Sequence, residues 1–406
     1  MLAQLLRGSG VIALGTLVGQ VVVLAATPWL ARVYSPADFG ELALLLSCSN
    51  IAAALACGRY DLAIPAADSA SGLRIFQLSV LVAIGTSSVV LFLLLVLKSV
   101  RAPIPAPLGE FMVVAGCVLA AGIQQAVIGL FTQARNYAGI AAIRLSQGTL
   151  FSAMAMFPGI GLVAAHALSF LATVPSAARR FTRTPPSVNG LIDTAKDHRA
   201  FPLQSLPGAV LDVVAFSICI WTVTFAYGSH DAGQFSQVQR LIGAPLLLIS
   251  MSMTQVLLRI TADQVQHPLA MRRLFRQIGV GALLAGTALV CVVAIAGESA
   301  LRWILGSGWT VDPGFILPIA LAVTVRACVS PLSSILVTLR RFDVALLWQA
   351  AYFVCAATTL GLAAFHLEFR DFLVIYAIHE VVLYAAYAFL IHRCVEKKHV
   401  RHLRSD

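Results

Sequence analysis

The sequence predicts an all-α polytopic membrane protein with about twelve transmembrane helices, in two six-helix lobes that are related by a parallel pseudo-repeat. Three observations predict this fold: the composition, the number of long apolar segments and the distribution of Lys and Arg. Of the 406 residues, 59% are hydrophobic and 11% are charged, whereas soluble domains have about 25% charged residues. So few charges cannot cover a water-exposed surface of this size, and lipid must therefore surround most of the chain.

Twelve apolar segments approach the roughly 20 residues that a helix needs to cross the hydrocarbon core of a bilayer. The first is long for the apolar part of a signal peptide, so we interpret it as a membrane helix. The weakest division separates the fifth from the sixth segment, where only Pro158 and Gly159 interrupt the apolar run. The predicted spans are residues 11–30, 39–57, 75–97, 108–131, 139–157, 159–178, 203–227, 235–258, 278–296, 315–339, 344–365 and 372–391.

The distribution of Lys and Arg orients these spans. If the helices alternate in direction, most of the 28 Lys and Arg residues lie in loops on the same side as the N-terminus. Because cytoplasmic loops carry this excess of positive charge, we predict that both termini are cytoplasmic. The longest polar connection separates the spans into two groups of six. The predicted organisation is an N-terminal lobe (1–180), a cytoplasmic linker (181–202), a C-terminal lobe (203–392) and a basic cytoplasmic tail (393–406).

A short repeat supports the division into two lobes. The segment from Tyr34 to Gly40 connects the first two spans, and the segment from Tyr227 to Gly233 connects the seventh and eighth. A Tyr, an Asp and a Gly recur in register, and the two tyrosines are 193 residues apart. Although Asp and Gly are common in short turns, their recurrence in corresponding loops favours a parallel repeat. Transporters commonly bind substrate between such halves.

Several function classes find no support in the sequence. It contains no nucleotide-binding P-loop, no nucleophile elbow and no paired acids in a polar loop, so we predict that the protein is not an enzyme. The net charge of +10 reflects the cytoplasmic loops rather than a basic arm that would bind nucleic acid. The 8 cysteines are scattered without metal-ligand spacing. We predict no metal and no cofactor, with H⁺ or Na⁺ as candidate coupling ions.

Arg326 is the most informative residue, because it lies in the middle of an apolar span. A charge at membrane depth costs about 2.5–3.5 kcal/mol on insertion scales and usually faces a bundle interior or an aqueous cavity. Ser330 and Ser333 follow it, and Pro331 between them predicts a kink that frees a carbonyl group. We interpret Arg326, Ser330 and Ser333 as a candidate anion site. The alternative is that Arg326 only pairs with an acid on a neighbouring helix.

Two other arginines are candidates for the same role. Arg240 lies nearer the outer end of the eighth predicted span, on a face with small polar residues. Its alternative role is to extend toward the outer headgroups. Arg59 follows the second span at the inner end and would capture an anionic headgroup. Its alternative is a local ion pair with Asp61.

Three residues are candidates for proton or ion coupling. Asp212 lies in the seventh predicted span, where an isolated buried carboxylate would hold a proton. The alternative is a salt bridge from Asp212 to Arg240 or Arg326. Glu380 and His379 lie in the twelfth span and form either a second proton site or part of a packing face.

Several segments, in order along most of the chain, resemble bacterial polysaccharide flippases. They run from Tyr34 to Gly40, from Gly58 to Pro65, from Phe201 to Pro207, from Gln239 to Pro245 with Met253 to Gln255, from Arg326 to Ser333 and from Leu346 to Gln349. The family comprises the O-antigen and capsule repeat-unit translocases of the multidrug/oligosaccharidyl-lipid/polysaccharide exporter (MOP) superfamily.

The resemblance implies twelve helices in two six-helix lobes around a central cavity, which opens alternately to each side of the membrane. It implies a cargo of oligosaccharide repeat units on polyprenyl pyrophosphate, moved from the cytoplasmic to the periplasmic leaflet of the bacterial inner membrane for surface polysaccharide or lipopolysaccharide. Arg59, Arg240 and Arg326 fall in matched segments as pyrophosphate contacts. Implied partners are the lipid-linked oligosaccharide, membrane lipids, a polysaccharide polymerase and glycosyltransferases. Asp212 and Glu380 depart from the family pattern. The alternative function is a cation-coupled drug or small-molecule antiporter of the same superfamily.

Overall fold

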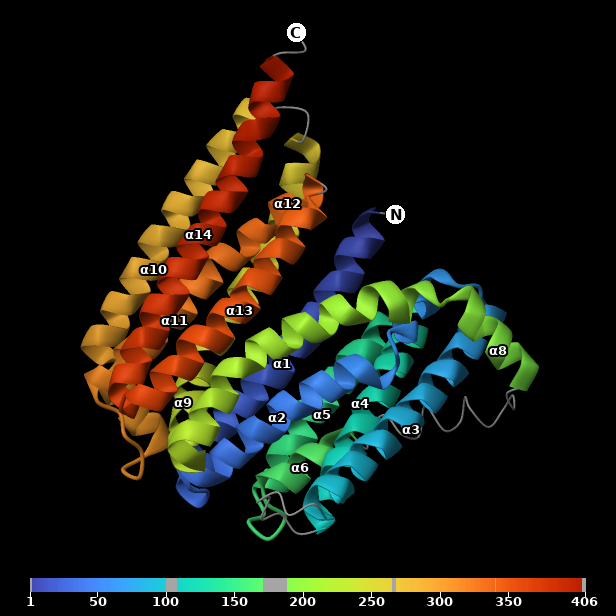
Figure 1. The fold of residues 1–406 in the computed structure, drawn as a ribbon, viewed down its shortest axis with the longest axis horizontal. Helices are drawn as coiled ribbons and strands as arrows, with labels where there is room; N and C mark the ends of the chain where they lie inside the picture. The colour runs from blue at the N-terminus through green and yellow to red at the C-terminus, as the bar shows by residue number, and fades with distance from the viewer. Residues whose placement is uncertain (1, 100–107, 171–187, 265–267, 340, 404–406) are drawn as a thin grey trace. The chain divides into compact units, whose positions relative to one another are not determined.

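The computed structural model describes residues 2–99, 108–170, 188–264, 268–339 and 341–403, and every regular element in these ranges is a helix (Figure 1). Nine helices in these ranges are long and apolar enough to cross a membrane. One of them, α9 (Leu206–Gln264), contains two predicted spans, which meet at Gly228 with a non-helical φ of 89°. Two shorter helices, α5 (Tyr137–Ala155) and α6 (Leu162–Ser169), cover the fifth span and the beginning of the sixth. The chain is therefore a multi-pass membrane protein, and about twelve spans agree with its helices.

The predicted division between the fifth and the sixth span, at Pro158 and Gly159, is confirmed. Residues 156–161 form turns between α5 and α6. Gly161 has a φ of 75°, which glycine adopts readily because it has no Cβ atom. The remainder of the predicted sixth span, from residue 171 onward, lies outside the described residues. The predicted linker is described from Val188 onward.

The first compact unit comprises Met1–Tyr34 and Glu41–Ser217. Within it, α3 packs against α4, and α6 packs against both α4 and α5 (Figure 1). The helices α1 and α5 meet through glycine, since a Cβ atom at Gly148 would lie 2.5 Å from the carbonyl oxygen of Gly19. Small residues allow such close backbone approach between membrane helices. The long helices of this unit are α1 (Leu2–Val33), α2 (Pro36–Ala56), α3 (Ser69–Ser99) and α4 (Leu108–Gln133).

The second compact unit comprises Ser35–Gly40 and Ile218–Asp406. Here α11 packs against α10 and α14, and α13 packs against α14 (Figure 1). Each of these contacts has a counterpart in the first unit. The pair α10 and α11 corresponds to α3 and α4, the pair α11 and α14 to α4 and α6, and the pair α13 and α14 to α5 and α6. The repeated packing supports the predicted pseudo-repeat. Besides α9 from Ile218 onward, this unit contains the long helices α10 (Pro268–Leu305), α11 (Pro313–Val329), α13 (Phe342–His366) and α14 (Phe369–Leu403) and the short helix α12 (Ser334–Thr338).

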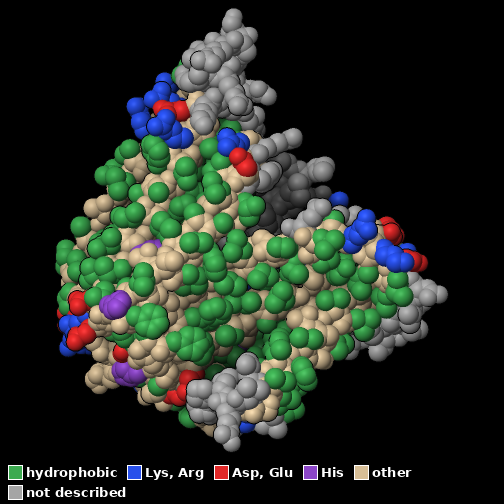
Figure 2. All heavy atoms as spheres, in the orientation of Figure 1, with side chains coloured by type: hydrophobic (Ala, Val, Ile, Leu, Met, Phe, Trp, Pro, Cys, Tyr) green, Lys and Arg blue, Asp and Glu red, His purple; other side chains and the backbone are tan. Residues whose placement is uncertain are grey.

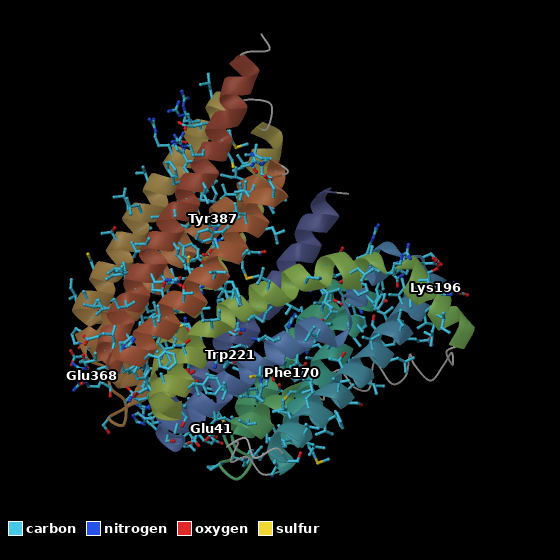
Figure 3. The ribbon with its side chains drawn as sticks, in the orientation of Figure 1. Glu41, Phe170, Lys196, Trp221, Glu368 and Tyr387 are labelled. Atoms are coloured by element: carbon cyan, nitrogen blue, oxygen red, sulfur yellow. The ribbon has the colours of Figure 1, made fainter. Side chains whose placement is uncertain are left out.

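The part of the predicted linker that the structure describes contains a helix of its own. Helix α8 (Val188–Asp197) packs on α3, and its Leu191 and Ala195 contact the hydrophobic core of the first unit. Lys196 of the same helix is exposed (Figure 3). A single π-helical turn, Phe201–Ser205, then leads into α9. At the other end of the chain, the predicted tail continues α14 as a helix as far as Leu403.

The surface of the described residues agrees with a lipid environment. Figure 2 shows hydrophobic side chains over most of the visible face, with Lys, Arg, Asp and Glu gathered mainly near the ends of helices. Large apolar side chains such as Phe225, Ile295 and Phe365 are at least 80% exposed. Water would make this exposure unfavourable, whereas lipid makes it neutral.

Candidate functional site

Arg326 lies at the centre of a polar cluster formed by three helices of the second unit. Its Nε donates a hydrogen bond of 2.9 Å to the hydroxyl of Tyr384 on α14, and its Nη2 donates one to the hydroxyl of Tyr352 on α13. Its Nε also lies 3.5 Å from Oε2 of Glu380 on α14. The side chain of Arg326 is 20% exposed, and that of Glu380 is 1% exposed. The predicted alternative, an acid partner on another helix, is therefore present, and the partner is Glu380.

Tyr352 joins the cation and the anion of this cluster. Its hydroxyl accepts a hydrogen bond from Arg326 and donates one of 2.6 Å to Oε1 of Glu380. The rings of Tyr352 and Tyr384 also lie 5.5 and 5.6 Å from Cζ of Arg326, which is within the range of cation–π attraction. The guanidinium group is thus held by two hydroxyls, two rings and one carboxylate. We use the name Arg326 cluster for Arg326, Tyr352, Glu380 and Tyr384.

Aromatic side chains pack around one side of the Arg326 cluster. The rings of Trp348 and Tyr387 stack at 4.3 Å with an angle of 6° between their planes (Figure 3 labels Tyr387). Trp348 also contacts the rings of Tyr352 and Tyr384. Sequence analysis did not single out Tyr352. The signal that could have found it is its spacing of four residues from Trp348, which places two amphipathic rings on one face of a membrane helix.

The predicted helix break next to Arg326 is confirmed. Helix α11 ends at Val329, residues Ser330–Ser333 form a 3₁₀ turn, and α12 begins at Ser334. Ser330 makes a side-chain hydrogen bond with Tyr384, so it belongs at the edge of the Arg326 cluster. Ser333 instead donates a hydrogen bond of 2.7 Å to the carbonyl oxygen of Ser330. In this structure Ser333 therefore stabilises the break itself.

Two more polar side chains of α14 lie beside the Arg326 cluster. The ring of His379 lies 5.9 Å from that of Tyr352, and its Nε2 is buried without a hydrogen-bond partner among the described residues. The hydroxyl of Tyr376, one turn before Glu380, accepts a hydrogen bond of 3.3 Å from Gln239 of α9. This bond connects α9 to α14 at the residue that precedes Arg240.

Arg240 differs from Arg326 in its surroundings. It is half-buried, and it makes no hydrogen bond or ion pair with any of the described residues. Its segment of α9 lies against α11, because a Cβ atom at Gly243 would lie 3.2 Å from Cγ1 of Val323, and Ser250 donates a hydrogen bond of 2.8 Å to the carbonyl oxygen of Ala327. The second unit thus holds two guanidinium groups in apolar segments but pairs only one of them with Glu380.

Arg59 lies in the first unit, in a sharp turn after α2. Gly58 and Arg59 both have left-handed backbone conformations, with φ of 56° and 63°. The turn directs Tyr60 and Asp61 into the hydrophobic core of this unit. Arg59 and Asp61 form no ion pair within 4.0 Å in the part of the chain that the structure describes, and Nε of Arg59 and Oδ1 of Asp61 are both buried without hydrogen-bond partners there. The alternative of a direct local ion pair is therefore not formed, although the positive charge of Arg59 still acts on Asp61.

Asp61 is expected to make stability depend on pH. Burial raises the pKa of this carboxyl above its ordinary value of 3.8, and the positive charge of Arg59 only partly offsets the increase. The folded protein therefore holds this proton more tightly than the unfolded chain does, so this contribution to stability is present below about pH 4 and is lost as the pH rises through the raised pKa. We expect Asp61→Asn to raise the thermal unfolding temperature at neutral pH and to flatten its pH dependence.

Asp68 provides the matched control for this measurement. It is exposed, and hydrogen bonds from Ser71 lower the pKa of its carboxyl. The variant Asp68→Asn should leave the pH dependence due to Asp61 in place. An Asp61→Asn variant with the unchanged pH profile of the natural protein would show that Asp61 is not the responsible group.

Asp212, the remaining predicted coupling residue, lies on α9 within the first unit. Its side chain lies outside the described residues, so its predicted role stays a prediction. The assembled candidate site consists of Arg326, Ser330, Glu380 and His379, which were predicted, together with Tyr352 and Tyr384 of the Arg326 cluster. Arg240 is on a helix that contacts the same helices, α11 and α14, and Arg59 belongs to the other unit.

The repeated segments make a contact that sequence analysis did not predict. A Cβ atom at Gly40 would overlap the carbonyl oxygen of Ser229, and a Cβ atom at Gly233 would overlap the carbonyl oxygen of Pro36. Since Pro36 and Ser229 are also 193 residues apart, the two contacts are reciprocal, as at a two-fold interface. We call residues 36–40 and 229–233 the repeat contact.

Comparisons with known proteins define the fold class. No protein-family model and no curated protein matches the sequence. The structure is similar to that of an inward-facing multidrug-resistance MATE family transporter of the MOP superfamily, with a TM-score of 0.68 and 13% identity over 95% of this chain and 99% of that chain. It is also similar to the lipid II flippase MurJ in its inward closed conformation, with a TM-score of 0.65 and 10% identity over 97% and 90% of the two chains.

A third similar structure is a MOP superfamily transporter from Pyrococcus furiosus, whose description reports a binding pocket of reversed polarity. Its TM-score is 0.61, and 13% of residues are identical over 97% of this chain and 96% of that chain. The chain therefore has the fold shared by these transporters and flippases. At sequence identities this low, the structural similarity establishes only the fold. The cargo must be argued from the candidate site.

Proposed function

We propose that this protein is a flippase that moves polyprenyl-pyrophosphate-linked oligosaccharide repeat units from the cytoplasmic to the periplasmic leaflet of the bacterial inner membrane, for surface polysaccharide or lipopolysaccharide biosynthesis. It works by alternating access and performs no chemistry on its cargo. Arg326, Arg240 and Arg59 bind the pyrophosphate, and Ser330 and Ser333 add polar contacts. Both termini are cytoplasmic, and glycosyltransferases and a polymerase supply and consume the cargo.

The observation that carries this proposal is the excess of positive charge within the second unit. Arg240 and Arg326 place two cations in apolar segments, and Glu380 supplies one anion. A guanidinium group without a carboxylate partner is costly at membrane depth, and its planar set of donors suits two-point contact with phosphate oxygens. An anionic cargo would satisfy Arg240. The MurJ similarity supports the same cargo class, because that protein is described as a lipid II flippase.

The membrane potential provides a driving force for this transport. With the cell interior negative, outward movement of an anionic headgroup is favourable by about 2.3 kcal/mol per charge for each 100 mV. The lipid tail stays in the bilayer while the protein shields the sugar and the pyrophosphate. Coupling to H⁺ or Na⁺, through Glu380, His379 or Asp212, would change the number of charges moved.

A deletion strain tests the proposal directly. It is expected to lose its surface polysaccharide and to accumulate lipid-linked repeat units in the inner leaflet, and expression of the protein should restore both. Normal polysaccharide in a deletion strain without a second copy of such a carrier would contradict the proposal.

The alternative is a cation-coupled drug antiporter of the same superfamily, and the similarity to a multidrug transporter favours it. Such a protein binds cationic drugs and needs an anionic site, which Glu380 of the Arg326 cluster would provide. The two functions differ in a simple measurement: resistance of the deletion strain to cationic drugs falls if the protein is an antiporter and stays unchanged if it is the proposed flippase.

A further inference from the structure

The hydrogen bonds from Arg326 to two tyrosines hold one edge of its guanidinium group. The N–H bond of Nε and one N–H bond of Nη2 point in the same direction and form one of the two-donor edges of this planar group. Nε donates to the hydroxyl of Tyr384, and Nη2 donates to the hydroxyl of Tyr352. Two partners on one edge fix the rotation of the plane as well as its position. The second two-donor edge, formed by Nη1 and Nη2, therefore points away from both tyrosines.

Each tyrosine hydroxyl is itself held by a second hydrogen bond. The hydroxyl of Tyr352 donates a bond of 2.6 Å to Oε1 of Glu380, and the hydroxyl of Tyr384 bonds with the side chain of Ser330. A hydroxyl with two hydrogen-bond partners loses one of them when it moves or rotates. The two acceptors of the guanidinium group are therefore fixed in place by α14 and by the break between α11 and α12.

The two tyrosines are more deeply buried than the cation that they hold. Tyr352 and Tyr384 are each 8% exposed, whereas the side chain of Arg326 is 20% exposed. The ring of Trp348 packs against both tyrosine rings, with centroid distances of 6.0 and 5.9 Å. A cargo therefore reaches the guanidinium group more easily than the hydroxyls that orient it. An effect of the two hydroxyls on a bound anion would pass through Arg326.

We propose that Tyr352 and Tyr384 are positioning residues, which orient Arg326 so that its Nη1–Nη2 edge contacts two oxygens of one cargo phosphate. The proposal rests on the proposed function, because it assumes a phosphate-bearing cargo at Arg326. Two parallel N–H···O bonds require a guanidinium plane with the correct rotation. A long side chain that is ordered before the cargo arrives also loses less conformational entropy on binding. Both effects lower the Kd for the cargo.

Binding of a defined probe to variants without these hydroxyls tests the proposal. The probe is a short-chain polyprenyl pyrophosphate joined to one sugar, and calorimetric titration of the full-length protein gives its Kd. The variants Tyr352→Phe and Tyr384→Phe each keep the aromatic ring beside Arg326 and remove only the hydroxyl that orients it. We expect each variant to raise the Kd about tenfold, which corresponds to the loss of one hydrogen bond to a charged group.

The same changes in an Arg326→Lys background distinguish positioning from packing. Arg326→Lys keeps the charge, but an ammonium group has no planar edge to orient, so this variant should bind the probe about tenfold more weakly. Adding Tyr352→Phe or Tyr384→Phe to it should then change the Kd by less than about twofold. A hydroxyl that only stabilised the packing of α13 and α14 would weaken binding equally in both backgrounds.

Tyr227→Phe is the matched control. Its hydroxyl donates a hydrogen bond of 3.0 Å to the carbonyl oxygen of Leu367, outside the Arg326 cluster, and its loss should leave the Kd unchanged. Thermal unfolding establishes that each variant is folded. Tyr352 and Tyr384 lie on different helices, so either variant tests the proposal if the other does not fold.

Three results would overturn the proposal. An unchanged Kd in a folded Tyr352→Phe or Tyr384→Phe variant would do so, because both hydroxyls are assigned the same role. So would an equal loss of affinity in the natural and the Arg326→Lys backgrounds, or a comparable loss in Tyr227→Phe. If the probe did not bind the natural protein, the proposed function would fail together with the inference. If it bound the natural protein and the tyrosine variants equally well, only the inference would fail.

Discussion

Replacing Arg326 by Met and Glu380 by Gln together is expected to give a folded protein that transports no cargo. The single change Arg326→Met leaves the carboxylate of Glu380 buried without its cation, which typically costs about 3–5 kcal/mol. The double change removes both charges, and replacement of a buried ion pair by neutral residues of similar size is often close to neutral for stability. The unfolding temperature of the double variant should therefore recover, whereas transport should not, because the cation proposed to bind the cargo is absent.

Two further variants make this result specific to Arg326. The same double exchange in the exposed pair of Arg302 and Glu298, which lie 2.6 Å apart on α10, should leave transport unchanged. Arg326→Lys should retain part of the transport, because it keeps the charge but loses two-point contact with phosphate. Full polysaccharide export by the Arg326→Met, Glu380→Gln variant would refute the role of Arg326 in binding cargo.

Gly233→Ala is expected to cause a large loss of stability. The new Cβ atom would overlap the backbone carbonyl of Pro36 and lie 2.8 Å from the backbone nitrogen of Gly40. Backbone atoms cannot rotate away as a flexible side chain can, so the repeat contact must separate. We expect a destabilisation above about 3 kcal/mol, at the upper end of the range for overpacking, measured as a lower unfolding temperature and a lower yield of folded protein.

Gly361→Ala is the matched control, because Gly361 lies on α13 and a Cβ atom there would meet nothing within 4 Å. An Ala in a helix interior is favoured over Gly by about 0.5–1 kcal/mol, so this variant should be slightly more stable than the natural protein. Gly40→Ala and Gly233→Ala should also be less than additive when combined, since the first already separates the contact that the second disturbs. Additive losses, or a Gly233→Ala protein as stable as the control, would show that the repeat contact does not hold these segments together.

Much of the fold follows from the sequence because lipid imposes strong rules on composition and length. The apolar segments predict the membrane helices, Pro331 predicts the break after α11, and the Tyr34 and Tyr227 segments indicate the repeat. The helix α8 was missed, because an amphipathic helix in a polar connection gives no long apolar run. The repeat contact was also missed, since sequence register shows which residues correspond and gives no information on which of them touch.

The candidate site could be predicted only in part. A charged side chain in an apolar span is energetically costly, so Arg326 can be identified from a single sequence. Its partners depend on which faces of α11, α13 and α14 meet, and that is a matter of tertiary packing. Sequence reasoning therefore proposed Asp212 as a partner and did not include Tyr352, whose single hydroxyl is inconspicuous in an apolar helix. Arg59 shows the opposite case, because Arg59 and Asp61 are close in sequence but make no direct ion pair after the left-handed turn at Gly58 and Arg59.

Reconstituted vesicles allow the most direct test of the flippase proposal. The purified protein is incorporated into vesicles that contain a polyprenyl-pyrophosphate-linked oligosaccharide, and a membrane-impermeant reagent then modifies the sugars exposed on the outside. The natural protein should make the lipid of both leaflets accessible, whereas vesicles with the Arg326→Met, Glu380→Gln variant should expose only the outer half. Equal accessibility of the lipid-linked sugars in vesicles with the natural protein and with the variant would contradict the proposal. So would a natural protein that does not flip the lipid but exports a cationic drug in the same vesicles.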